Sequence, residues 1–348
     1  AGAAILVHAD TGKVLFSKNA DSRMLIASTT KIMTALVVLE NCSPDEQVKI
    51  LPEYTKIEGS SMYLKPGETY TVRDLLYGML LASGNDAATA LACHCGGSIE
   101  GFAEMMNKKA AELGPCNSSF RNPHGLDADG HYSSAEDLAI ITCEAMKNDL
   151  FAKIVSTKTY TVGDQTYMNH NKLLWNYEGT LGVKTGYTMA AGRSLVSCAE
   201  RNGLRLVCVT LSDPNDWNDH KALYDWGFEN YEYKNILPMG VICQVPVISG
   251  EKDSVGVIAP EDTRVLVKKG VKLDMKLELP EFVYAGFGKG DCAGRIFVTA
   301  DDNEVGEFPL VYTESVKVAD NAKLSAWERF KRTWFIVNKY GFVFQGMD

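Results

Sequence analysis

Three short strings of residues carry side chains that could together perform acyl transfer. They are Ser28-Thr-Thr-Lys31, Ser83-Gly84-Asn85 and Lys184-Thr185-Gly186. A serine hydroxyl is a weak nucleophile until a base within hydrogen-bonding distance takes its proton. Because each string alone arises by chance in chains of this composition, the prediction depends on their order, their spacing and the elements that hold them.

The first string would supply the nucleophile and its base. Ser28 begins an apolar helix predicted over residues 28–40, and Lys31 follows one turn later on the same helix face. The Lys31 amine can act as a base only if its pKa falls from about 10.4 towards neutrality. The apolar helix would provide burial, and Lys184 is the candidate second cation. The helix start also offers N–H groups for an oxyanion.

The second string follows a helix predicted over residues 71–82 and is expected to form a loop. In that loop the Ser83 hydroxyl could relay a proton to the leaving amine. The Asn85 side chain could accept a hydrogen bond from Lys31 and donate one to a substrate carbonyl. The prediction is that Ser83 and Asn85 belong to the same site as Ser28.

The third string follows Leu181-Gly-Val183, which is typical of an edge strand. An ammonium and a hydroxyl, from Lys184 and Thr185, suit a terminal carboxylate, and Gly186 lets a substrate backbone approach closely. The backbone N–H of Tyr187 is the candidate second oxyanion donor, opposite that of Ser28.

Helical and strand patterns alternate over the first 230 residues. The sequence Thr-x-x-Asp at Thr71 and Ser-x-x-Asp at Ser134 predict capped helix starts. Asn202-Gly203 joins two apolar segments and predicts a β-hairpin. Helices are expected over residues 28–40, 71–82, 98–113 and 134–146, and strands over 194–199 and 204–211. The pattern favours a mixed α/β catalytic domain over residues 1–235.

The pattern of apolar and polar side chains changes after residue 235. Residues 271–279 alternate apolar and polar side chains, which predicts a strand with one buried face, and residues 236–320 are expected to form a small all-β domain. Residues 321–348 are expected to form a basic amphipathic helix with aromatic side chains on its apolar side. Such a helix suits the interface of a bilayer. The alternative is a terminal helix packed against its own domain.

Composition narrows the function further. The net charge of −9 over 348 residues speaks against general nucleic-acid binding.

The chain starts at Ala1 without methionine, and we expect a removed signal segment upstream. Its nine cysteines and six histidines show no zinc-ligand spacing, so the cysteines are interpreted as small buried hydrophobes and the histidines as structural or surface groups. The sequence predicts no metal and no cofactor.

The three strings resemble the signature strings of the penicillin-binding, active-site-serine DD-peptidases. The chain is most similar to the low-molecular-mass D-alanyl-D-alanine carboxypeptidases, in which the middle string is Ser-Gly-Asn. Residues 122–130, 173–175 and 225–228 add to the likeness, which covers residues 3–235 closely. His170 stands where relatives often have arginine, and it is left out of the predicted site.

The resemblance implies an α/β (α+β) fold of the DD-peptidase/β-lactamase type. It implies removal of the terminal D-alanine from peptidoglycan stem peptides through an acyl-enzyme, and covalent inhibition by β-lactams. It also implies an exported enzyme, attached peripherally to the outer face of the cytoplasmic membrane.

Two other functions fit part of the pattern. A class A β-lactamase adds a glutamate in a Glu-x-x-Leu-Asn-like loop between the second and third strings, and residues 86–183 contain none. A non-catalytic penicillin-binding sensor or scaffold would retain the fold without needing every catalytic side chain, and all of them are present.

Overall fold

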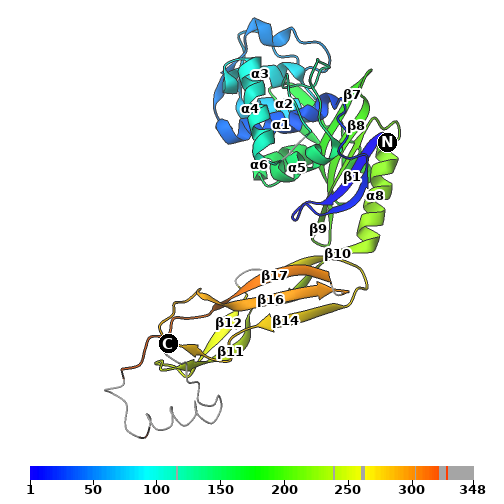
Figure 1. Ribbon diagram of the computed structural model, residues 1–348. Coiled ribbons are helices and arrows are strands. Elements are labelled where there is room, and N and C mark those ends of the chain that lie inside the picture. The colour runs from blue at the N-terminus through cyan, green and yellow to red at the C-terminus, as the bar shows by residue number, and fades with distance from the viewer. Residues whose placement is uncertain (115–116, 238–239, 260–262, 302, 321–326, 328–348) are drawn as a thin grey trace. The chain divides into compact units, whose positions relative to one another are not determined.

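The computed structural model describes residues 1–114, 117–237, 240–259, 263–301, 303–320 and Trp327, in two units (Figure 1). The first unit is Ala1–Glu229 and the second is Asn230–Asp348. The division falls a few residues before the predicted boundary after residue 235, because Tyr231–Leu237 forms a strand that pairs within the second unit. Apart from Trp327, the helix predicted over residues 321–348 lies outside the described residues.

A five-stranded antiparallel sheet is the centre of the first unit, with strand order β2-β1-β9-β8-β7. The first strand, β1, therefore pairs with β9, which forms some 200 residues later in the chain. The hairpin prediction is confirmed: Asn202 and Gly203 have φ of 52° and 76° between β8 and β9. The strands are β1 (Ala3–His8), β2 (Val14–Lys18), β7 (Thr180–Thr188), β8 (Gly192–Arg201) and β9 (Leu204–Leu211).

Both faces of this sheet are covered by helices. The helices α1 to α6 lie on one face and α8 (Asp216–Asn230) lies on the other (Figure 1). In β1 the side chains of Ile5 and Val7 enter the core shared with the helices. Leu6 points the other way, towards α8, where a Cβ at Gly227 would meet it at 3.0 Å. Burial on both faces explains why residues 3–7 of β1 are all apolar.

The helical layer carries most of the predicted helices with their caps. Thr71 accepts from the N–H of Asp74 and Ser134 from the N–H of Asp137, which confirms both capped starts. The helix predicted from residue 28 is a 3-10 turn, η1, followed by α1. The helices are η1 (Ala27–Thr30), α1 (Lys31–Asn41), η2 (Pro52–Thr55), α2 (Val72–Leu81), α3 (Asn85–Gly96), α4 (Ile99–Glu112), α5 (Ala135–Ala145), α6 (Asp149–Ser156) and α7 (Leu173–Asn176). Two short strand pairs complete the unit: β3 (Gln47–Lys49) with β4 (Thr69–Thr71), and β5 (Thr159–Val162) with β6 (Gln165–Met168).

The second string is only partly a loop. Ser83 and Gly84 connect α2 to α3, but Asn85 is the first residue of α3. Ser83 has a φ of 62°, a left-handed conformation that turns the chain sharply between the two helices. Asn85 is consequently held by a helix, and its side chain is positioned more firmly than a loop would position it.

The second unit is all-β among its described residues up to Asp320, as predicted. Six strands pair in the order β14-β16-β17-β12-β11-β15, and β10 pairs with β13. The strands are β10 (Tyr231–Leu237), β11 (Val241–Ile248), β12 (Ser254–Ile258), β13 (Thr263–Lys268), β14 (Leu273–Glu278), β15 (Val283–Tyr284), β16 (Cys292–Ala300) and β17 (Asn303–Tyr312).

The expectation of a buried face on the strand over residues 271–279 is wrong for the middle of the strand, although Val271, Leu273 and Leu279 are half-buried against the apolar clusters of the unit. The strand becomes β14, an edge strand, whose apolar side chains Met275 and Leu277 are 51% and 42% exposed. Alternation reports where a strand can bury a face, whereas the position of the strand in the sheet decides whether it does.

The cysteine prediction is also wrong for most positions. Among the eight described cysteines, all free thiols, only Cys198 and Cys208 are buried. Cys292 is exposed, and the other five are half-buried.

No helix among the described residues combines the length and the hydropathy that a bilayer crossing requires.

Candidate active site

Ser28 lies in a tight turn that joins the sheet layer to α1. The residue before it, Ala27, has a φ of 48°, a left-handed conformation that costs a residue with a Cβ roughly 1–2 kcal/mol. Strain of this kind is retained where the surrounding structure enforces it, and it concentrates at functional sites. The turn places the Ser28 hydroxyl at the surface of a cavity rather than within the core.

The Lys31 amine connects the first two strings. Its Nζ lies 3.0 Å from Ser28 Oγ and donates to Asn85 Oδ1 at 2.7 Å. It also donates to the carbonyl oxygen of His124 at 2.7 Å. The Asn85 and His124 oxygens can only accept, so they take two N–H groups of the amine. The third position on the nitrogen, which is a hydrogen in the ammonium and the lone pair in the neutral amine, therefore points towards Ser28.

The pKa of Lys31 is lowered well below its usual value. Burial is the largest cause, since the side chain has no exposed surface, and the charge of Lys184 is the second. The carboxylate of Asp86 opposes both effects. Burial also lowers the pKa of Lys184 to about 7. The two causes expected from the sequence, a desolvated helix and a second cation, therefore both act on Lys31.

A loop over residues 58–64 is fixed onto the start of α3. The Asn85 side chain donates from Nδ2 to the carbonyl of Glu58 at 2.7 Å, which fixes its oxygen towards Lys31. Asp86 accepts from the backbone N–H groups of Met62 and Leu64 at 2.8 and 3.1 Å. The first turn of α3 thus orients the Asn85 side chain and holds a wall of the site.

The loop over residues 122–130 packs behind the turn that carries Ser28. His124 provides the carbonyl that accepts from Lys31, and the carbonyl of Pro123 accepts from Thr34 Oγ1 at 2.6 Å. Gly125 has a φ of 87°, and a Cβ there would lie 1.9 Å from the carbonyl oxygen of Ala27. The sequence marked this loop only by family likeness; its role comes from backbone atoms, which composition does not reveal.

The third string lies on β7, an edge strand as predicted. The Lys184 side chain is 1% exposed, and its Nζ donates to the carbonyl of Thr185 at 2.9 Å. A Cβ at Gly186 would meet the backbone nitrogen of Ser28 at 3.1 Å. Glycine is therefore needed there for strand-to-turn packing, in addition to the predicted approach of substrate. The Tyr187 side chain projects outward and is mostly exposed.

A cavity of about 310 Å³ brings residues of all three strings together. Lys31 and Asn85 lie behind Ser28 and reach the site through the hydrogen bonds above. The cavity is lined by Ser28, Ser60, Ser83, His170, Lys172, Thr185, Gly186, Tyr187, Arg193, Asp216 and Trp217. The predicted site did not include Ser60, His170, Lys172, Arg193, Asp216 or Trp217, and His170 was interpreted as a structural or surface group.

Arg193 is the most firmly held of the missed residues. It lies on β8 directly opposite Tyr187 in the strand register. Its Nε and Nη2 donate to Asp216 at 2.9–3.1 Å, and its guanidinium lies 5.7 Å from the centre of the Trp217 ring. Asp216 is almost fully buried, and this burial raises its pKa. Arg193 can be recognised as a residue of the site only from the pairing of β7 with β8, which places it opposite Tyr187.

A serine hydroxyl beside a buried amine of lowered pKa, at the edge of an antiparallel sheet covered by helices, defines an active-site-serine acyl-transfer enzyme. The D-alanyl-D-alanine carboxypeptidase family pattern matches residues 1–215, and the C-terminal domain pattern of penicillin-binding protein 5 matches residues 231–318.

Individual relatives agree with these matches. The D-alanyl-D-alanine carboxypeptidase DacF of Bacillus subtilis is 34% identical, covering 95% of this chain and 91% of its own length. DacC of Escherichia coli, with the same enzyme name, is 34% identical over 90% of this chain and 83% of its own. The crystal structure of penicillin-binding protein 5 from Haemophilus influenzae has a TM-score of 0.76 at 32% identity, covering 91% and 97% of the two chains. The chain therefore belongs to the D-alanyl-D-alanine carboxypeptidase family of serine peptidases.

Proposed function

We propose that Ser28 attacks the carbonyl carbon of the D-Ala–D-Ala amide at the end of a peptidoglycan stem peptide. Lys31, as the neutral amine, takes the proton of the Ser28 hydroxyl as the Oγ–C bond forms. The observation that carries this proposal is the set of three contacts at Nζ: two fixed acceptors, Asn85 Oδ1 and the His124 carbonyl, and Ser28 Oγ at 3.0 Å. With both acceptors satisfied, the lone pair of the neutral amine faces Ser28.

The oxyanion and the leaving group use the other predicted residues. The backbone N–H groups of Ser28 and Tyr187 would donate to the oxygen that gains negative charge. Asn85 has a second amide hydrogen for a substrate carbonyl. Ser83 would pass the proton from Lys31 to the D-alanine nitrogen as the C–N bond breaks. Water then attacks the acyl-enzyme and gives a proton to Lys31. As the Oγ–C bond breaks, Lys31 returns that proton to Ser28 Oγ and the shortened peptide leaves.

Recognition of the free carboxylate is assigned to the third string and to Arg193. Lys184 supplies positive charge beside the site, and the Thr185 hydroxyl can donate directly. The Arg193 guanidinium keeps Nη1 free among the hydrogen bonds of the described residues, since Nε and Nη2 bind Asp216. Because Asp216 and Trp217 hold its plane, Arg193 would meet a carboxylate without first being ordered.

We further propose that the enzyme acts in the cell-wall compartment and attaches to the membrane surface through residues 321–348. The support is the sequence of this segment, in which basic residues oppose Trp and Phe on an amphipathic helical pattern. A family acting on peptidoglycan also implies an exported enzyme.

One assay tests the enzymatic proposal. The protein is incubated with a labelled penicillin while D-alanine release from a D-Ala–D-Ala peptide is followed in parallel. We expect a long-lived mass adduct on Ser28 and release of D-alanine. The Ser28→Ala variant should lose both, and the exposed Ser17→Ala variant should keep both.

Three other outcomes would contradict this proposal. Rapid hydrolysis of penicillin would identify a β-lactamase, and the absence of any adduct would favour a sensor or scaffold. Labelling of another serine in Ser28→Ala would contradict the assignment of the nucleophile.

A further inference from the structure

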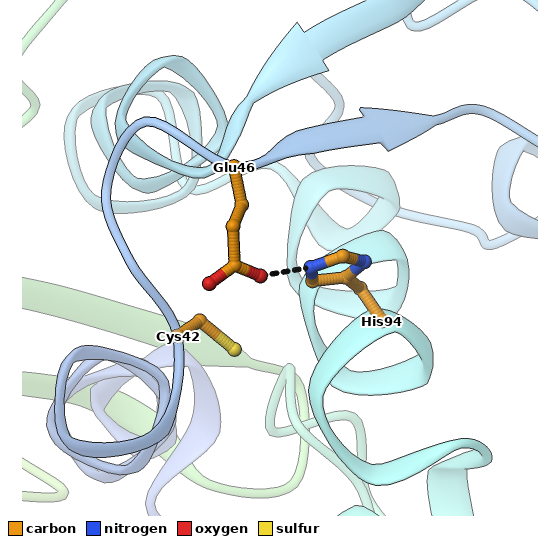
Figure 2. A group of neighbouring side chains, drawn as sticks. All are labelled: Cys42, Glu46 and His94. Atoms are coloured by element: carbon orange, nitrogen blue, oxygen red, sulfur yellow. Dashed lines mark hydrogen bonds and ion pairs between the residues drawn. The ribbon is translucent and has the colours of Figure 1, made fainter.

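A cluster of metal-ligating side chains lies in the first unit, outside the catalytic cavity. One sulfur, one carboxylate oxygen and one imidazole nitrogen, from Cys42, Glu46 and His94, lie within 4.8 Å of one another. Figure 2 shows the three side chains converging from the segment that follows α1 and from the last turn of α3. The neighbouring Cys95 thiol, which affects the pKa of the Cys42 thiol, lies outside this 4.8 Å group and would turn towards it to serve as a fourth ligand.

We propose that Cys42, Glu46, His94 and Cys95 bind one zinc ion, or a similar transition-metal ion, that stabilises the fold. Thiolate, imidazole and carboxylate together suit zinc, which takes four such ligands in a tetrahedron. Thiolates argue against magnesium or calcium, which take oxygen ligands.

The three grouped side chains need only a small adjustment to accept the ion, whereas Cys95 must move further. Metal–ligand bonds of about 2.0–2.3 Å in a tetrahedron place ligand atoms roughly 3.3–3.8 Å apart. His94 Nε2 and Glu46 Oε2 are 2.9 Å apart and share a proton, which the ion would replace. The second oxygen of Glu46 accepts from the N–H of Ser43 at 2.6 Å, so this carboxylate is already oriented.

The ends of two helices add to the attraction for a cation. Cys42 is the C-cap of α1, and His94 and Cys95 lie in the last turn of α3. A helix C-terminus carries partial negative charge from its free carbonyl groups, which favours a cation nearby. Two such ends and a carboxylate therefore face the same small volume.

The location indicates a structural role. The opposite ends of α1 and α3 carry Lys31 and Asn85, and at 1.5 Å per residue an eleven-residue helix puts the cluster roughly 16 Å from Lys31. An ion at that distance touches no reacting atom. It would instead join the C-terminal ends of the two helices that carry the catalytic amine and its amide partner.

Metal binding to the full-length protein tests this directly. The protein is stripped with a chelator under reducing conditions, then titrated with Zn²⁺ or Co²⁺. We expect one equivalent of tightly held metal and, with Co²⁺, a thiolate-to-cobalt charge-transfer band. At free Zn²⁺ one hundred times its Kd, the melting temperature of the first unit should rise by about 5–10 °C.

Matched variants locate the site. Cys42→Ser and His94→Gln should each lose the cobalt band and at least tenfold in affinity. Cys93→Ser, which removes a half-buried thiol from the same helix but outside the cluster, should bind as the parent does.

The proposal would be overturned by three results. These are no retained metal in the parent, equal binding by Cys42→Ser, or a Cys42–Cys95 disulfide found by peptide mapping of protein purified without reductant. None of these readouts depends on peptidase activity.

Discussion

At the residue scale, the chemistry rests on the charge state of two buried amines. Lys31 and Lys184 are both almost without exposed surface. Burial lowers both pKa values, and the charge of Lys184 lowers that of Lys31 further. The cost of desolvating an ammonium thus favours the neutral Lys31 amine, the form that can act as a base.

The pH profile should report this coupling. A neutral Lys31 is the base, so acylation falls as the pH drops through the Lys31 pKa. Lys184→Gln removes the cation that lowers this pKa; the pKa of Lys31 then rises, and the acidic limb moves to higher pH. Rates of acylation by a labelled β-lactam, measured across pH for both proteins, check this. An acidic limb that stays in place would show that another group titrates.

A general base contributes about 10²–10⁴-fold to the rate, so Lys31→Ala should lose that much of its acylation rate. The variant of an exposed lysine, Lys153→Ala, should keep the parent rate.

Arg193 makes a separate prediction about specificity. A hydrogen bond to a charged group contributes about 1.5–3 kcal/mol, so Arg193→Ala should lower kcat/KM for a D-Ala–D-Ala peptide by roughly 10–150-fold. The loss should shrink for the same peptide amidated at its C-terminus, because that substrate offers no carboxylate. Comparing both substrates with both proteins provides the measurement. An equal loss on the two peptides would mean that Arg193 acts only through the packing of Asp216.

At the element scale, the catalytic groups are positioned by turns and helix ends that press on one another. The left-handed turn at Ala27, the loop that carries Gly125 and the edge strand at Gly186 meet behind and beside Ser28. None of these contacts involves a reacting side chain. They nevertheless fix where the Ser28 N–H and hydroxyl point.

Gly125→Ala should disturb this contact with no change in catalytic side chains. The added Cβ would lie 1.9 Å from the Ala27 carbonyl, at a φ that alanine resists. We expect at least a hundredfold loss of acylation together with a lower melting temperature. Gly130→Ala is the matched control, since its φ is 74° but its Cβ would meet only the flexible Arg121 side chain. It should cost about 1 kcal/mol of stability and little activity. Similar losses of activity for the two variants would contradict a special role for Gly125.

At the scale of the whole molecule, the chain consists of two units with different contents. The first unit contains every residue assigned to the peptidase site, and the second is a β unit with its own apolar clusters. The segment that follows is proposed to place the enzyme at a membrane surface, which would concentrate it near its substrate.

Deletion of residues 321–348 tests the attachment. Basic side chains near an anionic surface contribute about 1 kcal/mol each, and the aromatic face adds burial. The truncated protein should bind anionic vesicles at least tenfold more weakly in a sedimentation assay. Its release of D-alanine from a soluble peptide should be unchanged. Undiminished vesicle binding would favour a helix packed against its own domain.

The sequence by itself identified the candidate nucleophile, its candidate base and the family, because Ser28 and Lys31 are one helical turn apart and that relation is local. The capped helix starts at Thr71 and Ser134 were predictable for the same reason. Only the tertiary structure decided that Arg193 faces the cavity, that the His124 carbonyl holds Lys31, and that Met275 stays exposed. It also joined Cys42 to His94, some fifty residues away, in a cluster that no ligand spacing suggests. Contacts of this kind depend on strand register and on which elements pack together, and a one-dimensional pattern does not encode the distance between residues far apart in the chain.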